Sequence, residues 1–163
     1  SGGIDKISPF ASLFRGKGIN IAVLCDYGEG DKTKVQRLRT SQILKSEGIF
    51  VATDFTGKSE SDIEDFFTPE LFTSIVNGAY ELKGKQAVGP RKLTEDRALT
   101  RQVKQMEALF NVMDSTVPEF DHFTPASWLI RNQEVLEKDE AIVNDSLDRF
   151  EKAFKEINSL LTK

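Results

Sequence analysis

The clearest pattern in the chain is an apolar run over residues 19–26, where six of the eight positions are apolar and do not alternate with polar ones. This pattern predicts a strand that is buried on both faces of a parallel sheet. The run stops at Asp26, and the following loop holds Gly28 and Gly30, which allow a sharp turn of the backbone. A second apolar run over residues 49–54 predicts another buried strand.

Residues 33–46 lie between these two runs and predict a helix. Its apolar positions are Val35, Leu38, Ile43 and Leu44. A strand, a helix and a second strand joined by short connections form a right-handed unit whose strands run parallel. The carboxyl ends of the strands then share one edge of the sheet, so we expect Asp26 and Asp54 on the same side.

A short helix is predicted ahead of the first strand. Ser8 is a good N-cap residue, and Pro9 suits the first helical position. The apolar residues at helical spacing here are Ile7, Phe10, Ala11 and Phe14. Gly16 and Gly18 are expected to end the helix.

The chain is predicted to be all-helical after residue 66. Residues 67–69 read Phe-Thr-Pro, which supplies a hydrophobic staple, an N-cap and a first helical proline, with Phe72 closing the staple. Residues 123–125 repeat these three residues, with Trp128 in the place of Phe72. The basic loop from Gly84 to Pro90 is the predicted boundary between an α/β part and a helical part.

Two longer helices are predicted over residues 97–113 and 138–161, each with apolar positions alternately four and three residues apart. The apolar positions are Leu99, Val103, Met106, Phe110 and Met113 in the first, and Val143, Leu147, Phe150, Phe154, Ile157 and Leu161 in the second. Such seams predict antiparallel packing of the two helices at a crossing angle of about 20°. Exposure of Phe150 and Phe154 would instead indicate an oligomer interface.

Composition indicates a soluble globular protein with one ordinary domain, because 39% of the 163 residues are hydrophobic and 29% are charged. No apolar run reaches the roughly 18 residues that span a bilayer, so no membrane partner is expected. A single cysteine, Cys25, favours a reducing, cytoplasmic location and a core role in the strand, since no basic group is placed to activate its thiol. A net charge of −4 argues against nucleic-acid binding by this chain alone, without metal ions or a basic partner domain.

Candidate chemistry gathers around Asp26. A strand-end aspartate followed by a glycine-rich acidic loop indicates a metal or phosphate site, or simply a solvated turn. The polar segment 56–65 leaves the same sheet edge, so its acids Asp62, Glu64 and Asp65 can fold back toward Asp26 as oxygen ligands or stay a solvated turn. His122 is the only histidine, and without cysteine or a second histidine it favours a structural or surface role over a zinc site.

With these elements placed, the chain resembles the C-terminal part of ATP-dependent endonucleases of the OLD (overcoming lysogenization defect) family, specifically their Toprim nuclease domain. The segments that carry the resemblance are Gly2-Gly3-Ile4-Asp5-Lys6, residues 20–26, Gly28-Glu29-Gly30-Asp31-Lys32 and Asp62-Ile63-Glu64-Asp65. It covers residues 2–75 well and the helical tail, including residues 120–125, more loosely. The resemblance implies an α/β fold: a partial, Rossmann-like Toprim parallel sheet over residues 1–83 and a C-terminal helical region over 84–163.

The resemblance also implies a two-metal site for Mg²⁺ or Mn²⁺, with DNA as substrate. The family ligands are a glutamate on an early strand, an Asp-x-Asp strand end and later acids. Asp26 matches the first aspartate of that motif. Glu64 matches the later acidic element, with Asp62 or Asp65 beside it.

Two departures from the family pattern affect this site. Gly28 stands where the second aspartate is expected, so Glu29 or Asp31 has to substitute. The early glutamate and the ATPase domain, through which ATP would act, would lie ahead of Ser1. We therefore expect a fragment that is inactive alone, whose partners are DNA and that ATPase domain.

The leading interpretation is a metal-dependent DNA endonuclease with Asp26 and Glu64 as catalytic metal ligands. The other candidate metal ligands are Asp31, Asp62 and Asp65. Two alternatives stay open. The α/β part is a non-catalytic scaffold whose long helices form an interaction or dimerisation arm, or Asp26 is a phospho-acceptor.

Overall fold

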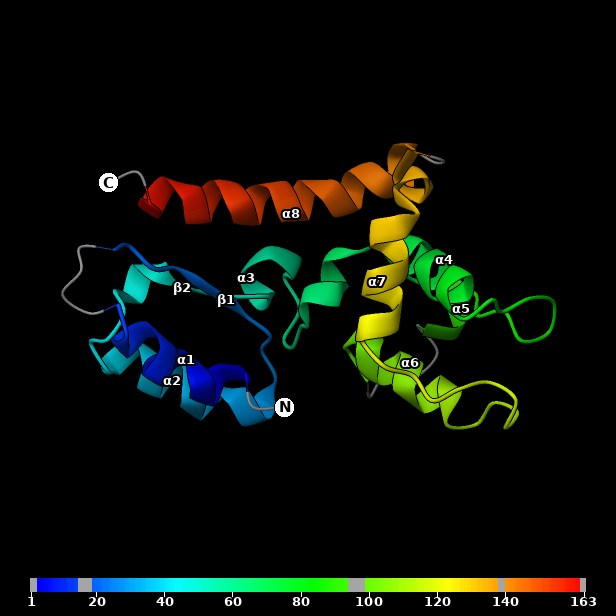
Figure 1. Ribbon diagram of the computed structural model, residues 1–163, viewed down its shortest axis with the longest axis horizontal. Helices are drawn as coiled ribbons and strands as arrows, with labels where there is room; N and C mark the ends of the chain where they lie inside the picture. The colour runs from blue at the N-terminus through cyan, green and yellow to red at the C-terminus, as the bar shows by residue number, and fades with distance from the viewer. Residues whose placement is uncertain (1–2, 15–18, 94–98, 138–139, 162–163) are drawn as a thin grey trace. The chain divides into compact units, whose positions relative to one another are not determined.

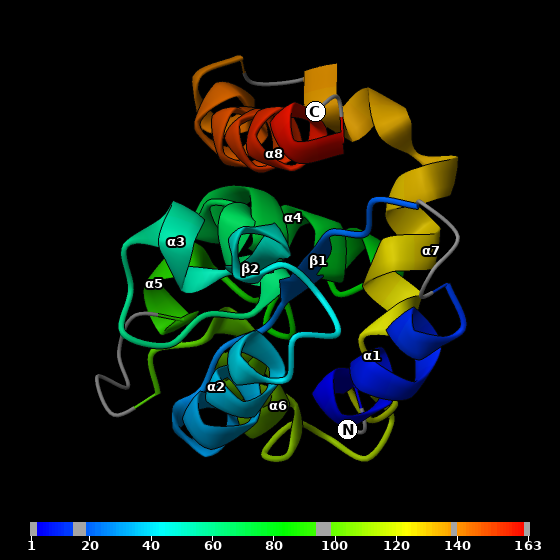
Figure 2. The ribbon, with the colours of Figure 1, turned by 90° about the vertical axis from the view of Figure 1, so that its left-hand side faces the viewer.

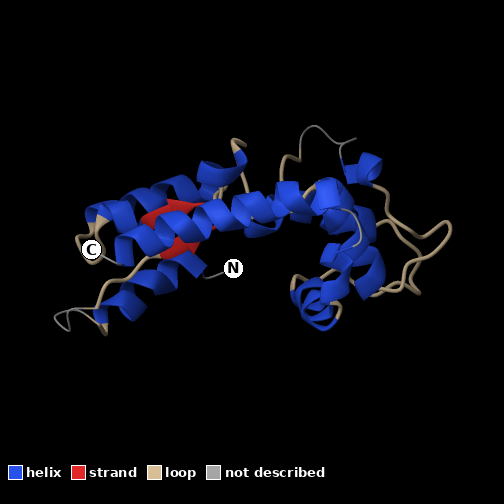
Figure 3. Ribbon diagram, turned by 90° about the horizontal axis from the view of Figure 1, so that it is seen from above, coloured by secondary structure: helices blue, strands red, loops and turns tan. Residues whose placement is uncertain are grey.

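The computed structural model describes residues 3–14, 19–93, 99–137 and 140–161. The described chain is mostly helical, with one small sheet of two strands (Figures 1 and 3). It divides into two compact units: the first comprises Ser1–Ile63 and Arg149–Lys163, and the second Glu64–Asp148. The division therefore falls after Ile63, whereas the sequence predicted a boundary at the loop that begins at Gly84.

The sheet of the first unit consists of strands β1 (Val23–Cys25) and β2 (Ile49–Val51), which run parallel and side by side (Figure 2). Val23 pairs with Ile49 and Cys25 with Val51. The prediction of adjacent parallel strands is confirmed, although both strands are shorter than the apolar runs that predicted them. The unit is mixed α/β.

Asp54 does not end the second strand as predicted, because it lies on the short helix α3 (Thr53–Thr56). Its Oδ2 accepts a hydrogen bond from the Val51 N–H at 3.0 Å. The next N–H along, that of Ala52, donates to Cys25 of β1 at 2.8 Å. Since successive N–H groups of a strand point to opposite sides, Asp54 binds the side of β2 that faces away from β1.

Helices α1 (Gly3–Ser12) and α2 (Lys32–Thr40) pack against each other beside the sheet. Their shared apolar cluster contains Ala11, Val35, Leu38, Leu44, Ile49 and Val51, with Ile4 and Ile7 packed against it. The predicted start of α1 at Ser8 is wrong, because the helix begins five residues earlier and holds Pro9 inside it. The glycines predicted to end α1 lie outside the described residues.

α2 is shorter than the predicted helix 33–46. It ends at Thr40, and Gln42 then adopts a positive φ of 55° that a helix cannot continue through. Leu44 still reaches the apolar cluster from outside the helix.

The second unit is built around α4 (Pro69–Ala79), with α5 (Pro90–Leu93), α6 (Gln102–Phe110), α7 (Phe123–Arg131) and the first part of α8 (Glu140–Leu161). Short 3₁₀ turns cover residues 29–31, 46–48, 63–66 and 133–137. The predicted start of α4 is confirmed: the Thr68 hydroxyl accepts from the Leu71 N–H, and Pro69 is the first helical residue.

The matching prediction for α7 is wrong, because Asp121 and not Thr124 supplies the cap. One Asp121 oxygen accepts from the N–H groups of Phe123 and Thr124, both at 2.8 Å, and the other accepts from Thr124 Oγ1 at 2.7 Å. These bonds hold the pKa of Asp121 below its ordinary value, and the bond from Thr124 Oγ1 has the largest effect. The charged cap is therefore complete at neutral pH and weakens as the pH falls through that lowered pKa.

Within the second unit, the seam of α6 packs on α4 and not, as predicted, on the seam of α8. The part of the α8 seam after Asp148 belongs to the first unit, so its packing on α6 stays a prediction. Val103, Met106 and Phe110 of α6 share a buried cluster with Phe72 and Val76 of α4.

On α8, Val143 packs in a separate cluster with Leu71 and Ile75, which lie on another side of α4. α4 thus contacts the seam of α6 on one side and Val143 of the α8 seam on another. Phe154 is 58% exposed and Leu147 is 43% exposed. No helix among the described residues is long and apolar enough to cross a membrane.

Helices α4 and α7 meet at Gly78 and Trp128. A Cβ atom added to Gly78 would lie 2.3 Å from Trp128 Cζ2 and 2.6 Å from Cη2, well inside van der Waals contact. The missing side chain at Gly78 therefore lets the indole ring lie directly against the α4 backbone.

Candidate functional site

Asp26 follows β1 at the carboxyl end of the parallel pair and ties a later loop to it. Its Oδ1 accepts a hydrogen bond from the Ile63 N–H at 2.9 Å. The neighbouring residues Tyr27 and Ser61 form an antiparallel bridge with two backbone bonds of 2.8 Å. The polar segment therefore folds back onto the end of β1 through Ser61 and Ile63. The approach of its acids to Asp26 stays a prediction.

The acidic loop after β1 forms a 3₁₀ turn over Glu29–Asp31. Asp31 Oδ2 accepts from the Gly28 N–H at 3.2 Å, and its Oδ1 lies 4.0 Å from Lys34 Nζ. The Glu29 N–H donates to Glu60 Oε1 at 2.5 Å, which joins this loop to the segment that carries Ser61. Gly28 has an ordinary φ of −130°, so the turn does not use the conformational freedom that the glycines offered.

The environment at this edge of the sheet shifts the pKa of the Cys25 thiol. Burial, followed by the negative charges of Asp26 and Asp31, raises the pKa of the thiol to about 11. The thiol is therefore neutral at pH 7, which supports its predicted role as a small core residue and not as a nucleophile. The same effect shows that both carboxylates act on the end of β1.

The five predicted metal ligands are divided between the two units. Asp26, Asp31 and Asp62 belong to the first unit, and Asp62 is buried, with 5% exposure. Glu64 and Asp65 belong to the second unit.

Within the second unit, both acids have partners of their own. Asp65 is buried and its Oδ1 accepts from the N–H of Gln102, the first residue of α6, at 3.0 Å. Glu64 Oε1 lies 3.1 Å from His122 Nδ1. Among the residues that the structure describes, no group of three or more His, Cys, Asp or Glu side chains could hold a metal ion. The ligand set therefore stays a prediction.

A second polar cluster, in the second unit, joins His122 to two glutamates. His122 Nδ1 faces Glu64 Oε1 at 3.1 Å, and its Nε2 faces Glu107 Oε1 at 3.6 Å. Lys104 Nζ binds the other oxygen of Glu107 at 2.6 Å. Because the two carboxylates lie at opposite nitrogens of the ring, they do not converge on one point where a metal ion could bind.

Sequence reasoning did not find this cluster. It placed His122 in a structural or surface role and assigned Glu64 to the metal site. His122 is 56% exposed, so the surface part of that interpretation is confirmed. Glu64 lies 58 positions from His122 in the chain, and no local spacing relates the two.

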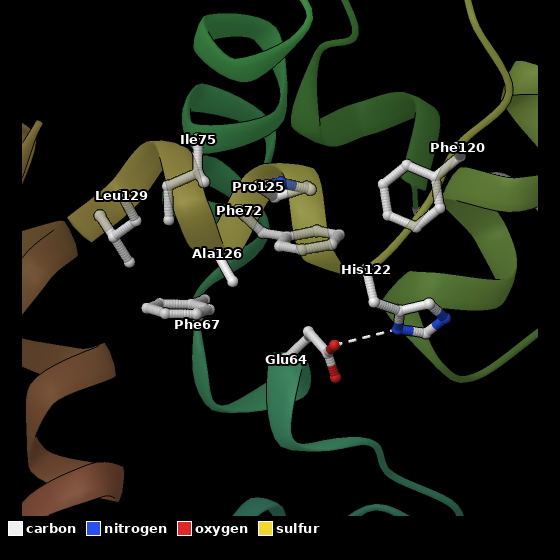
Figure 4. Close-up of a pocket in the computed structure, with 9 residues that line it drawn as sticks. All are labelled: Glu64, Phe67, Phe72, Ile75, Phe120, His122, Pro125, Ala126 and Leu129. Carbon is white, nitrogen blue, oxygen red and sulfur yellow. Dashed lines mark hydrogen bonds and ion pairs between the residues drawn. The ribbon is translucent and has the colours of Figure 1, made fainter. Parts of the chain in front are cut away.

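The pair of Glu64 and His122 stands at the rim of an apolar pocket (Figure 4). The other lining residues are Phe67, Phe72, Ile75, Phe120, Pro125, Ala126 and Leu129. Three elements supply most of the lining: α4, α7 and the segment just before α7. All the lining residues belong to the second unit.

No known family model matches the chain, and no curated protein or solved structure matches it either.

Proposed function

We propose that the chain is part of a divalent-metal-dependent DNA endonuclease of the Toprim type, coupled to an ATPase domain in the intact protein. One observation carries the proposal: Asp26 stands at the carboxyl end of a parallel strand pair, and two acid-bearing loops are hydrogen-bonded to each other and to that end of β1. Ligands of open α/β sheets bind outside the carboxyl ends of the strands.

Carboxylate oxygens are the ligands that Mg²⁺ and Mn²⁺ prefer. A bound ion of this kind would polarise the phosphodiester and activate the attacking water. In the proposal Asp26 is the principal ligand, and Asp31 and Asp62 of the same unit lie on the loops around it. Glu64 and Asp65, which the sequence also predicted as ligands, belong to the second unit and have partners there, so they are not part of this proposal.

The residues of the first unit fit part of such a site but not all of it. Two ions need more carboxylates than Asp26, Asp31 and Asp62 provide, because each ion must stay bound while the phosphate reacts. We therefore assign the missing ligand to the early glutamate of the family pattern, outside this chain.

The experiment that tests the function is nicking of supercoiled plasmid by the intact protein, with ATP and with Mg²⁺ or Mn²⁺. We expect nicked circles only when a divalent ion is present, and none in excess EDTA. Nicking that persists in EDTA, or none under any metal condition, contradicts the proposal.

The isolated 163-residue chain is expected to show little or no nicking. Its ligand set is incomplete, and a net charge of −4 does not retain DNA without bound cations. The measurement is the same plasmid assay across Mg²⁺ and Mn²⁺ concentrations. Robust nicking that Asp26→Ala abolishes would show that the chain alone holds a complete site.

One observation favours a second candidate, in which the helical part is a dimerisation arm. Leu147 and Phe154 are both exposed on α8 and lie seven residues apart, which puts them on one face of the helix. Exposed apolar residues in one stripe are typical of contacts between proteins. A second copy of the chain is the partner in this proposal.

Phe154→Glu should therefore abolish dimers, because it places a charge in the apolar stripe. Sedimentation velocity at several concentrations measures the oligomeric state. Ala141→Glu is the control, since Ala141 is also exposed on α8 but lies on a different face. A wild-type chain that stays monomeric, or a dimer that both variants keep, rules the arm out.

A further inference from the structure

All residues that line the apolar pocket belong to the second unit, whereas Asp26, Asp31 and Asp62 of the proposed nuclease belong to the first. The cavity volume of the pocket is about 60 Å³. Because a water needs roughly 10–15 Å³ of such space and a cavity that takes up benzene measures about 150 Å³, the cavity has room for several waters or for part of one small ring, the rest of which lies at the open mouth of the pocket. Protein interiors are normally close-packed, so unfilled apolar space of this size costs the lining side chains part of their packing contacts.

The lining favours an apolar group over water. Phe67, Phe72 and Phe120 contribute three aromatic rings, and Ile75 and Leu129 contribute aliphatic surface (Figure 4). A water needs two to four polar partners, which this lining does not offer below its rim. Ala126 lines the pocket and is exposed, so a ligand can reach the pocket from solvent.

The rim selects the charge of the ligand. Glu64 carries a carboxylate at the pocket, and Glu107 carries another at the far side of His122. Both ring nitrogens of His122 face carboxylates, so neither nitrogen points to a ligand in the pocket. Lys104 binds Glu107 and so does not offer its charge to an anion in the pocket. A cationic head group is therefore favoured here, and a carboxylate is disfavoured.

We propose that this pocket binds a small organic cation: one ring in the apolar cavity and a primary ammonium hydrogen-bonded to Glu64. The ring gains contacts with the phenylalanines, and the ammonium gains a charge-assisted hydrogen bond. The inference does not depend on the proposed nuclease.

The test compares three ligands with the same ring: benzylamine, benzyl alcohol and benzoate. Each is titrated into the chain in EDTA, which removes divalent ions, and binding is followed by ligand-detected and amide NMR. We expect benzylamine to bind at least about tenfold more tightly than benzyl alcohol, because one charge-assisted hydrogen bond accounts for an affinity difference of that size. Benzoate should bind most weakly. Nuclear Overhauser effects should connect the benzylamine ring to Phe67 and Phe72.

Two variants separate the parts of the site. Glu64→Gln keeps a hydrogen-bonding oxygen but removes the charge, so the tenfold preference for the amine should fall to within about twofold. Ala126→Leu should block the entrance and abolish binding of benzylamine and benzyl alcohol. Because Ala126 is exposed and helical, leucine is tolerated there. Ala141→Leu, at an exposed position of α8, is the matched control and should bind as the wild type does.

Several results would overturn the proposal. They are equal affinities for the amine and the alcohol, an unchanged preference in Glu64→Gln, full binding by Ala126→Leu, and Overhauser contacts only to residues outside the pocket. Failure of all three ligands to bind the wild-type chain at millimolar concentration also overturns it.

Discussion

Replacing Asp26 with asparagine in the intact protein should lower metal-dependent plasmid nicking by at least about 100-fold. Even residues that only support a metal ligand cost 10–100-fold in affinity or activity when they are changed. Asp26 is proposed as a direct ligand, so its loss should reach the upper end of that range or exceed it. Initial rates of nicking at saturating Mg²⁺ and Mn²⁺ provide the measurement.

Asparagine is the informative substitution because Asp26 also has a structural role. Its Oδ1 accepts the Ile63 N–H, and an amide oxygen can accept the same bond. Asp26→Asn therefore removes charge while the loop stays tied to β1, whereas Asp26→Ala removes both. If Asp26→Asn and Asp26→Ala lose the same nicking activity, and Asp26→Asn keeps the thermal stability of the wild type, the result supports a ligand role.

Asp5→Asn is the matched control for charge. Asp5 is an exposed carboxylate of the same unit, paired with Lys34 at 3.3 Å. The nicking rate of Asp5→Asn should stay within about twofold of the wild-type rate, because an exposed ion pair contributes little to stability. Near-normal nicking by Asp26→Asn would contradict the proposed site.

Gly78→Ala should destabilise the second unit by roughly 2 kcal/mol or more. Two effects oppose each other. Alanine in place of glycine in a helix gains about 0.5–1 kcal/mol. The new Cβ, however, would lie 2.3 Å from Trp128 Cζ2, and overpacking of this kind typically costs 1–3 kcal/mol and occasionally more. The clash should win, since moving the indole separates α4 from α7.

Chemical denaturation followed by tryptophan fluorescence measures this loss, because Trp128 is the only tryptophan. Gly3→Ala is the control, since a Cβ there meets nothing within 4 Å. Removing the indole should remove the clash. In the Trp128→Leu background, measured by circular dichroism, Gly78→Ala should therefore lower the stability far less than it does in the wild type. A Gly78→Ala variant more stable than the wild type would show that helix propensity dominates and that the approach of the ring is not tight.

The parallel strand pair could be predicted because its signals are local. Two apolar runs, a helix-length segment between them and short connections leave little choice of topology. The return of segment 56–65 to the end of β1 followed from the same argument. The cap of α4 at Thr68 was also readable, since threonine before proline leaves one good N-cap residue.

The errors arose where two local signals competed or where a partner had to be chosen. Pro9 suggested a helix start, but Ile4 and Ile7 precede it and pack on the cluster of α1 and α2, which extends the helix through the proline. Before Pro125 there are two possible caps, and Asp121 wins over Thr124 with bonds to two backbone N–H groups.

Packing partners were the least predictable part. The seams of α6 and α8 identify an apolar face of each helix, but a period of three and four residues does not say which helix covers that face. Here α4 covers the seam of α6 and, at Val143, the start of the seam of α8. The contact of Glu64 with His122 and the approach of Trp128 to Gly78 are long-range in the same sense, so one sequence contains no signal for them.

The central claim is that Asp26 holds a divalent cation at the carboxyl end of β1, and paramagnetic broadening by Mn²⁺ tests it most directly. Substoichiometric Mn²⁺ added to the isotope-labelled chain should selectively broaden the amide signals of Tyr27, Ser61 and Ile63, which surround Asp26. An excess of Mg²⁺ should restore these signals, and Asp26→Asn should not show the broadening. Broadening centred elsewhere, or broadening at these three amides that Asp26→Asn keeps in full, would contradict the account.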